Sequence, residues 1–199
     1  MFVLGLTGSL GMGKSTTAGF FAEFGIPVHD ADAAVHGLYK TEAVPLVEAA
    51  FPGTTAAGEV DREKLAHRVL NDSAAIKKLE GIVHPLVRAA EERFLANAES
   101  NNAQVAVLDI PLLFETGGDR RCDAVVVVSA PEEVQRTRIF ERPGMTAQKF
   151  AAIAANQMPD MEKRKRADFV VDTSKGFDAA RSQVREILAR IATMPRRRQ

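Results

Sequence analysis

Residues Phe2–Thr17, FVLGLTGSLGMGKSTT, contain the strongest structural signal of the sequence. Its first residues are apolar and β-forming, which predicts a short buried strand over Phe2–Thr7. The pattern Gly-x4-Gly-Lys-Ser follows at once, from Gly8 to Ser15. Residues 16–24 then predict a helix that stops at Gly25. A strand, a glycine-rich turn ending in Lys-Ser, and a helix occur in the order that a phosphate-binding P-loop requires.

The chemistry of phosphate binding explains this spacing. Glycines let the backbone N–H groups point inward at the start of a helix, where anions are favoured. Lys14 is placed to reach the β- and γ-phosphates of a nucleotide, and the Ser15 hydroxyl to ligate Mg²⁺. An accidental glycine turn with Lys-Ser would arise in roughly one chain in a hundred of this length, and the flanking elements make it rarer. The residues that we expect to contact ATP are Gly8, Gly11, Met12, Gly13, Lys14, Ser15 and Thr16.

Composition narrows the class of protein. A chain of 199 residues with 46% hydrophobic residues fits one α/β domain with room for an inserted subdomain. The sequence has no apolar run near the length of a membrane span, and Cys122 is its only cysteine. Because Met1 leads straight into the first strand, we expect no signal peptide and a cytoplasmic location. Lys+Arg and Asp+Glu balance at 26 each, so we expect no nucleic-acid partner, and the Arg196–Arg198 tail should be a solvated terminus.

Four further apolar runs predict strands that alternate with helices. The predicted strands cover residues 26–29, 104–109, 123–129 and 169–172. This alternation predicts a P-loop NTPase of the α/β class, with a five-stranded parallel sheet flanked by helices.

Two segments depart from this alternation. Residues 34–103 predict helices and no strand, with a new helix starting at Pro85, and we interpret them as a helical acceptor-binding subdomain. Residues 142–162 begin with a Pro-Gly break and continue as a helical run, which predicts a lid. The nucleotide-binding core is then expected to comprise residues 1–33, 104–141 and 163–199.

Three aspartates follow predicted strands, where ligands of parallel sheets bind. Asp30 and Asp32 follow the second strand, and Asp109 closes the third. Phosphoryl transfer needs one carboxylate near Mg²⁺ and one that accepts the proton of the attacking hydroxyl. A helix cap is the alternative for Asp30-Ala-Asp32, and the sequence does not decide which carboxylate contacts Mg²⁺.

Other polar residues have both a structural and a functional interpretation. His84 precedes Pro85 at a predicted helix start, where it could cap the helix or bind an acceptor phosphate. Arg138 and Arg142 share one helix face and are either solvated or placed to stabilise a transferring phosphoryl group. The basic run Lys163–Arg166 favours a solvated face over a phosphate clamp.

Taken together in this order, the motifs resemble those of the dephospho-coenzyme A kinase family over nearly the whole chain. The matching pieces are Leu6-Thr7-Gly8 with the P-loop, Val28–Asp32, Asp61-Arg62 with Leu65, Leu79-Glu80 before His84-Pro85, Pro111–Glu115, Gln135 with Arg138 and Arg142, Gln157, and Ala167-Asp168. Many kinases share the P-loop, whereas DAD, HP and PLLFE at these spacings are specific.

The resemblance implies ATP-dependent phosphorylation of the ribose 3′-hydroxyl of dephospho-CoA, with Mg²⁺ as cofactor. Asp32 would accept the hydroxyl proton, Lys14 and Arg142 would stabilise the transferring group with help from Arg138, and Ser15 would hold Mg²⁺. The residues that the resemblance places at the acceptor are Asp32, His84, Leu113, Glu115 and, more weakly, Arg62.

The chain departs from the family pattern at three places. Ser9 and Met12 replace more typical loop residues, Ile153 stands where many members have Arg, and Thr173 stands where Asn is common. Because of the Ile153 departure, a contact between the lid and ATP stays undetermined. Because of the Thr173 departure, the contacts to adenine stay undetermined as well. Another small-molecule or nucleoside monophosphate kinase is the alternative enzyme. A GTPase switch is a further alternative, but the sequence has no Asn-Lys-x-Asp motif for guanine recognition. A nucleic-acid-binding ATPase is another, but the sequence does not have the basic character that such proteins need. The sequence leaves the oligomeric state undetermined.

Overall fold

The computed structural model describes residues 1–70 and 72–197, so Arg198 of the basic tail lies outside the described residues. The chain divides into two compact units, residues 1–29 with 98–199 and residues 30–97. In the described part of the chain, no helix has the length and apolar character needed to cross a membrane.

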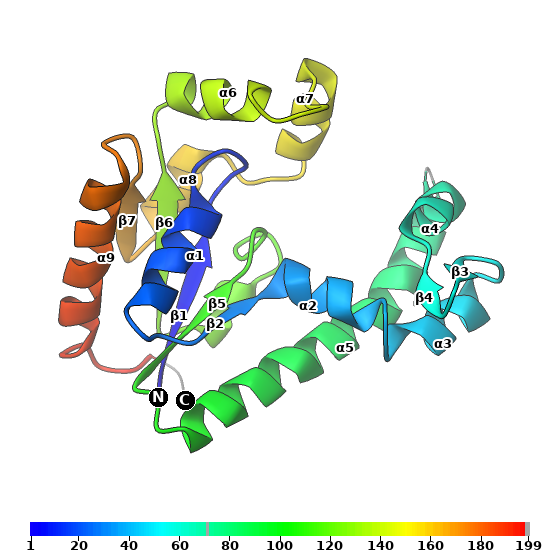
Figure 1. Ribbon diagram of the computed structural model, residues 1–199, viewed down its shortest axis with the longest axis horizontal. Helices are drawn as coiled ribbons and strands as arrows, with labels where there is room; N and C mark the ends of the chain where they lie inside the picture. The colour runs from blue at the N-terminus through cyan, green and yellow to red at the C-terminus, as the bar shows by residue number, and fades with distance from the viewer. Residues whose placement is uncertain (71, 198–199) are drawn as a thin grey trace. The chain divides into compact units, whose positions relative to one another are not determined.

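A five-stranded parallel sheet is the centre of the first unit, in the order β2-β5-β1-β6-β7 (Figure 1). The strands are β1 (Phe2–Thr7), β2 (Val28–Asp30), β5 (Val105–Asp109), β6 (Ala124–Ser129) and β7 (Phe169–Asp172). Every residue of β1 and β6 is buried, as expected for strands with both faces covered. The predicted five-stranded sheet and the fold class are therefore confirmed.

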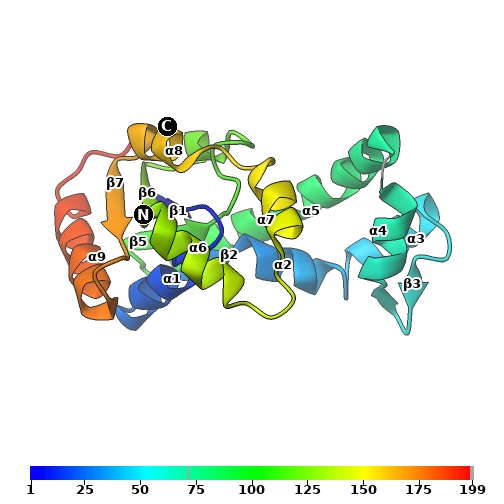
Figure 2. The same cartoon turned by 90° about the horizontal axis from the view of Figure 1, so that it is seen from above.

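Helices cover both faces of this sheet. Figure 2 shows α1 and α9 on one face and α8 on the other. The helical elements of this unit are α1 (Lys14–Glu23), the 3₁₀ turn η1 (Gly118–Arg121), α6 (Glu132–Phe140), α7 (Ala147–Ala154), α8 (Asp160–Arg166) and α9 (Phe177–Ile191). The main core packs Phe20 and Phe21 of α1 and Val184 of α9 against the apolar side chains of β1, β6 and β7.

The second unit contains a small hairpin where the sequence predicted helices alone. Its elements are α2 (Ala31–Leu38), α3 (Ala43–Ala50), β3 (Thr55–Ala56), β4 (Glu59–Val60), α4 (Arg62–Val69) and most of α5 (Ser73–Ser100). The turn between β3 and β4 has Ala57 at φ 51° and Gly58 at φ 81°, the two positive φ angles of a tight hairpin. The prediction of a strand-free segment was wrong because each strand has only two residues, too few for an alternating pattern.

The helix break predicted at Pro85 is also wrong. α5 runs through Pro85 as one helix of 28 residues. Proline removes one helical hydrogen bond, to the carbonyl of Gly81, and its ring crowds that carbonyl. Both residues are exposed, so water can satisfy the freed carbonyl. Asp72 accepts hydrogen bonds from the N–H groups of Ala74 and Ala75 at 2.9 and 3.0 Å and so caps the start of α5.

Proline inside α5 predicts a measurable gain on its removal. Because proline costs ~3 kcal/mol relative to alanine in a helix interior, Pro85→Ala should raise the free energy of unfolding by about 1–3 kcal/mol. Urea unfolding followed by circular dichroism measures the change. Gly81→Ala is the matched control and should raise it by about 1 kcal/mol. A lower free energy of unfolding for Pro85→Ala would show that proline is needed for packing.

Candidate functional site

The P-loop lies tightly against its neighbours. Gly11 and Gly13 have φ angles of 81° and 92°, which other residues rarely adopt. A Cβ atom on Gly8 would stand 2.7 Å from the Val128 carbonyl oxygen of β6. One on Gly11 would stand 2.7 Å from Ile139 Cγ1 of α6. The loop therefore needs glycine here for both conformation and space.

The loop opens directly into α1, whose first residue is Lys14. The N–H groups of the first helical turn, including those of Ser15 and Thr16, have no partner within the helix. Ser15 and Thr16 are exposed, so their hydroxyl and N–H groups are available to a ligand. Together with the helix dipole, this arrangement favours a bound anion.

Lys14 forms an ion pair with Asp109 at the end of β5, with Nζ in contact with Oδ1. Parallel pairing of β1 with β5 places Leu6 beside Asp109, so both groups emerge at the same edge of the sheet. Asp109 is only 2% exposed. A carboxylate at this depth needs a positive partner, and Lys14 supplies one. The structure thus joins two of the predicted residues.

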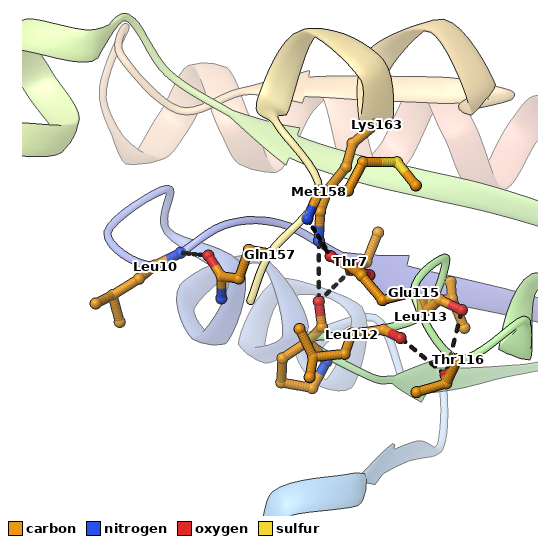
Figure 3. Close-up of polar contacts among 10 residues, drawn as sticks. Thr7, Leu10, Leu112, Leu113, Glu115, Thr116, Gln157, Met158 and Lys163 are labelled. Carbon is orange, nitrogen blue, oxygen red and sulfur yellow. Dashed lines mark hydrogen bonds and ion pairs between the residues drawn. The ribbon is translucent and has the colours of Figure 1, made fainter. Parts of the chain in front are cut away.

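Two glutamines hold the peptide groups of Leu10 in the P-loop. Gln157 Oε1 accepts the Leu10 N–H at 3.2 Å, as Figure 3 shows. Gln135 Nε2 donates to the Leu10 carbonyl at 2.7 Å. The loop is thereby tied to α6 and to the segment between α7 and α8.

A cavity of about 360 Å³ lies beside the loop in the same unit. Its lining residues are Gly11, Gly13, Thr16, Thr17, Phe20, Arg138, Glu141, Arg142, Thr173, Gly176, Phe177 and Ala180. Arg142 is exposed, and Phe177, at 73%, is the most exposed of the large apolar side chains. The cavity thus offers an aromatic face and two guanidinium groups next to the anion site.

Thr173 connects the P-loop to α6. Its hydroxyl donates to the Met12 carbonyl at 2.7 Å and accepts from Arg138 Nη1 at 2.8 Å. Arg138 Nη2 also donates to the Thr173 carbonyl at 2.7 Å. The Met12 side chain also contacts the residue that follows β6, because the Met12 sulfur accepts the Ala130 N–H at 3.2 Å. These contacts could not be predicted from local patterns, because their partners lie far apart along the chain.

The segment after β7 is fixed by local hydrogen bonds. The Ser174 hydroxyl and N–H donate to Asp172 Oδ1 at 2.6 and 2.8 Å. The hydroxyl bond is the main reason why the pKa of the Asp172 carboxyl lies below its ordinary value. Gln183 of α9 binds both backbone groups of Asp172, each at 2.9 Å. The position of Thr173 at the cavity is therefore set from both sides.

The PLLFE segment has a structural part in this unit. Leu113 is wholly buried, with its Cδ2 atom 2.7 Å from a Cβ built on Gly5. Glu115 Oε1 accepts the Met158 N–H at 2.7 Å and pairs with Lys163 Nζ at 3.0 Å (Figure 3). The prediction of a solvated face is wrong for Lys163, which is 0% exposed, although Arg164, Lys165 and Arg166 are exposed.

The remaining predicted residues lie in the unit of residues 30–97. Asp30 caps α2, because its carboxylate accepts the Ala33 N–H at 3.0 Å. Asp32 is exposed in the first turn of the same helix. His84 is exposed within α5, so its predicted place at a helix start is corrected.

Arg62 lies at the start of α4, close to α2. Its Nη1 atom lies 3.2 Å from His36 Nδ1. Burial raises the pKa of the Tyr39 hydroxyl, and the charge of Arg62 partly opposes that shift. Arg62 is thus associated with polar groups of α2, the helix that carries Asp32.

The donor set has a bearing on metal binding. Among the residues that the structure describes, there is no group of three or more His, Cys, Asp or Glu side chains able to hold a metal ion. Mg²⁺ in kinases takes one or two protein oxygens, with phosphate and water completing its shell. The Ser15 hydroxyl and the Asp109 carboxylate, both beside Lys14, are oxygen donors of this kind, so the residues fit Mg²⁺ carried in with a nucleotide.

Comparison of the sequence with known proteins identifies the family of this chain. Residues 2–178 match the family model described as dephospho-CoA kinase. The dephospho-CoA kinase of Rhodopseudomonas palustris is 65% identical over 198 residues, which is 100% of both chains. That of Nitrobacter winogradskyi is 64% identical, also over 100% of both chains.

Solved structures agree. A Thermus thermophilus protein matches with a TM-score of 0.86 at 33% identity, over 97% of this chain and 98% of that one. The dephospho-CoA kinase from Campylobacter jejuni matches with a TM-score of 0.65 at 25% identity, over 95% and 96%. Shikimate kinase from Acinetobacter baumannii, at 18% identity over 97% and 94% and a TM-score of 0.52, shares the fold alone. The chain has the P-loop kinase fold and belongs to the dephospho-CoA kinase family.

Proposed function

We propose that this kinase transfers the γ-phosphoryl group of ATP to the ribose 3′-hydroxyl of dephospho-CoA, giving coenzyme A and ADP. The family supports this acceptor. The main support for phosphoryl transfer is the ion pair that holds Lys14 of the P-loop against Asp109. A cavity of about 360 Å³ lies beside the same loop.

The nucleotide would occupy the P-loop and the adjoining cavity. Its phosphates would accept hydrogen bonds from the free N–H groups of residues Gly13 to Thr16, and Lys14 would contact the β- and γ-phosphates. The adenosine would enter the cavity, where Phe177 offers an exposed ring for stacking. Arg138 is bound to Thr173 and would shape this pocket, whereas exposed Arg142 is available to the phosphoryl group.

Mg²⁺ would be held by the Ser15 hydroxyl, with Asp109 as the nearest carboxylate to Lys14. The ion neutralises charge on the phosphate oxygens when bound. The protein's own contribution is the paired Lys14 and Asp109, which keeps both charges in place before a nucleotide arrives.

The acceptor would be bound by the unit of residues 30–97, which overlaps the 34–103 segment interpreted from the sequence as the acceptor-binding subdomain. Asp32 would accept the proton of the 3′-hydroxyl as the new O–P bond forms and the bond to the ADP oxygen breaks. Asp32 suits this role better than Asp30, whose carboxylate already caps α2. Arg62, with His36 beside it, and His84 are exposed basic groups for the acceptor's phosphates.

Residues 142–162 would act as a lid over the nucleotide. None of the residues of α7 is buried, so this helix is held by few packing contacts. Closure would bring Arg142 and its neighbours over the phosphates and exclude water from the transferring group.

A coupled assay of ADP release tests the function. We expect release in the presence of ATP and Mg²⁺ to require dephospho-CoA, and the product to match coenzyme A by mass. Parallel reactions contain AMP, adenosine or no acceptor. Release with AMP instead would replace the acceptor assignment by a nucleoside monophosphate, and release without any acceptor would contradict the kinase.

Asp32→Asn should lower kcat by about 10²–10⁴-fold, the usual value of a positioned general base, with little change in KM for ATP. Steady-state kinetics with dephospho-CoA measures both constants. Asp30→Asn is the matched control. Asparagine also caps helices well, so this variant should keep nearly wild-type kcat. Equal losses in the two variants would contradict Asp32 as the base.

Arg142→Ala should lower kcat by about 10²-fold, because a cation near the transferring group stabilises the transition state more than the bound substrate. Arg136→Ala is the control, since Arg136 is exposed and stacks over Phe140 of the same helix, 5.5 Å from the ring centre. A variant that raises KM for ATP and leaves kcat intact would assign Arg142 to nucleotide binding instead.

A further inference from the structure

Lys163 is the most deeply buried charged side chain of the described residues. Its exposed fraction is 0%, in a run of basic residues whose other members are exposed. Burial of an ammonium group is costly unless it is paired and hydrogen-bonded. Nothing in the proposed chemistry uses this group, so its place in the fold needs its own explanation.

The Lys163 ammonium joins two segments of the chain. Nζ pairs with Glu115 Oε1 at 3.0 Å and donates to the Pro111 carbonyl at 3.1 Å. Pro111 lies two residues beyond Asp109, the partner of Lys14. The Thr7 hydroxyl, one residue before Gly8, donates to the same carbonyl at 2.9 Å. The Pro111 carbonyl therefore joins the backbone that follows Asp109 both to Lys163 and to the strand end that precedes the P-loop.

The same carboxylate holds the base of the lid. Glu115 Oε1 accepts the Met158 N–H at 2.7 Å, and the preceding Gln157 binds the P-loop at Leu10 N at 3.2 Å. Figure 3 shows the Glu115 carboxylate facing both Met158 and Lys163, with Gln157 reaching Leu10 of the loop. Consecutive residues at the lid base thus contact both the P-loop and the Glu115–Lys163 pair.

We propose that Lys163 is a positioning residue for phosphoryl transfer, acting through Pro111 and Glu115. We call Lys163, Glu115, Pro111 and Met158 the Lys163 anchor. The anchor sets the Asp109 segment against the P-loop and fixes the end of the lid at residues 157–162. Lid movement is then confined to residues 142–156. This inference rests on the proposed function for its effect on turnover, but the anchor itself is independent of the acceptor.

Two variants test the anchor. Lys163→Met removes the ammonium group and keeps the length of the side chain. Glu115→Gln keeps an oxygen for the Met158 N–H, removes the negative charge and replaces the other oxygen with an NH2 group, so it carries the test if Lys163→Met fails to fold. Lys165→Met is the matched control, because Lys165 lies in the same helix and pairs with the exposed Glu162 at 2.8 Å.

The first readout is turnover per folded molecule, with folded protein counted by ADP binding. We expect kcat to fall by about 10–100-fold in Lys163→Met, with KM for ATP and dephospho-CoA changed by less than about threefold, because misplaced groups weaken the transition state. Lys165→Met should stay within about twofold of wild type. A fall in kcat of less than about fivefold, or a change confined to KM, would overturn the proposal even if the variant were less thermally stable.

The second readout needs no substrate. Amide hydrogen exchange at Leu10 and Met158 should be at least about tenfold faster in Lys163→Met than in Lys165→Met, since loss of the anchor frees both contacts. Unchanged exchange at both amides would overturn the anchor whatever the activity. A wild-type enzyme that fails to phosphorylate dephospho-CoA would overturn the proposed function instead, and the exchange rates would still report on the anchor.

Discussion

The ion pair between Lys14 and Asp109 is the interaction on which the rest of the site depends. It exists because β1 and β5 are adjacent parallel strands in register, with Leu6 beside Asp109. Their carboxyl ends leave the sheet together, so the glycine-rich loop after one strand meets the carboxylate after the other. A buried carboxylate without a cation would lower the free energy of unfolding, and a loop lysine without a counter-charge would not be held in one position. Each residue therefore holds the other in place at the P-loop.

Local patterns predicted the fold well. The P-loop and the five strands follow from short-range spacing, and the structure confirms them. Local rules failed at Pro85, where α5 continues because water can donate a hydrogen bond to the freed carbonyl. They also missed the β3–β4 hairpin, whose strands are too short to show alternation. Both errors lie in the inserted unit.

The site was predicted in part. Glycine spacing and the position of strand ends pointed to Lys14 and Asp109, because these signals lie within single elements. The contacts of Thr173 and Lys163 were not predicted, since each residue acts through partners that only the tertiary fold brings near. A basic run looks solvated in any sequence, and only packing shows that one of its lysines faces inward. The roles of Asp32, His84 and Arg62 stay predictions that belong to the other unit.

The order of strands in the sheet has a consequence for synthesis on the ribosome. β1 is made first, yet its two neighbours, β5 and β6, follow the insertion of residues 30–97. The nascent chain therefore carries an apolar strand without partners until β5, at Val105–Asp109, has emerged, while the insertion already holds its own core around Val47 and Leu65. Early folding of the insertion shortens the effective loop between β1 and β5, which lowers the entropy cost of closing the sheet. Mutations that weaken the insertion should thus expose β1 to aggregation during translation.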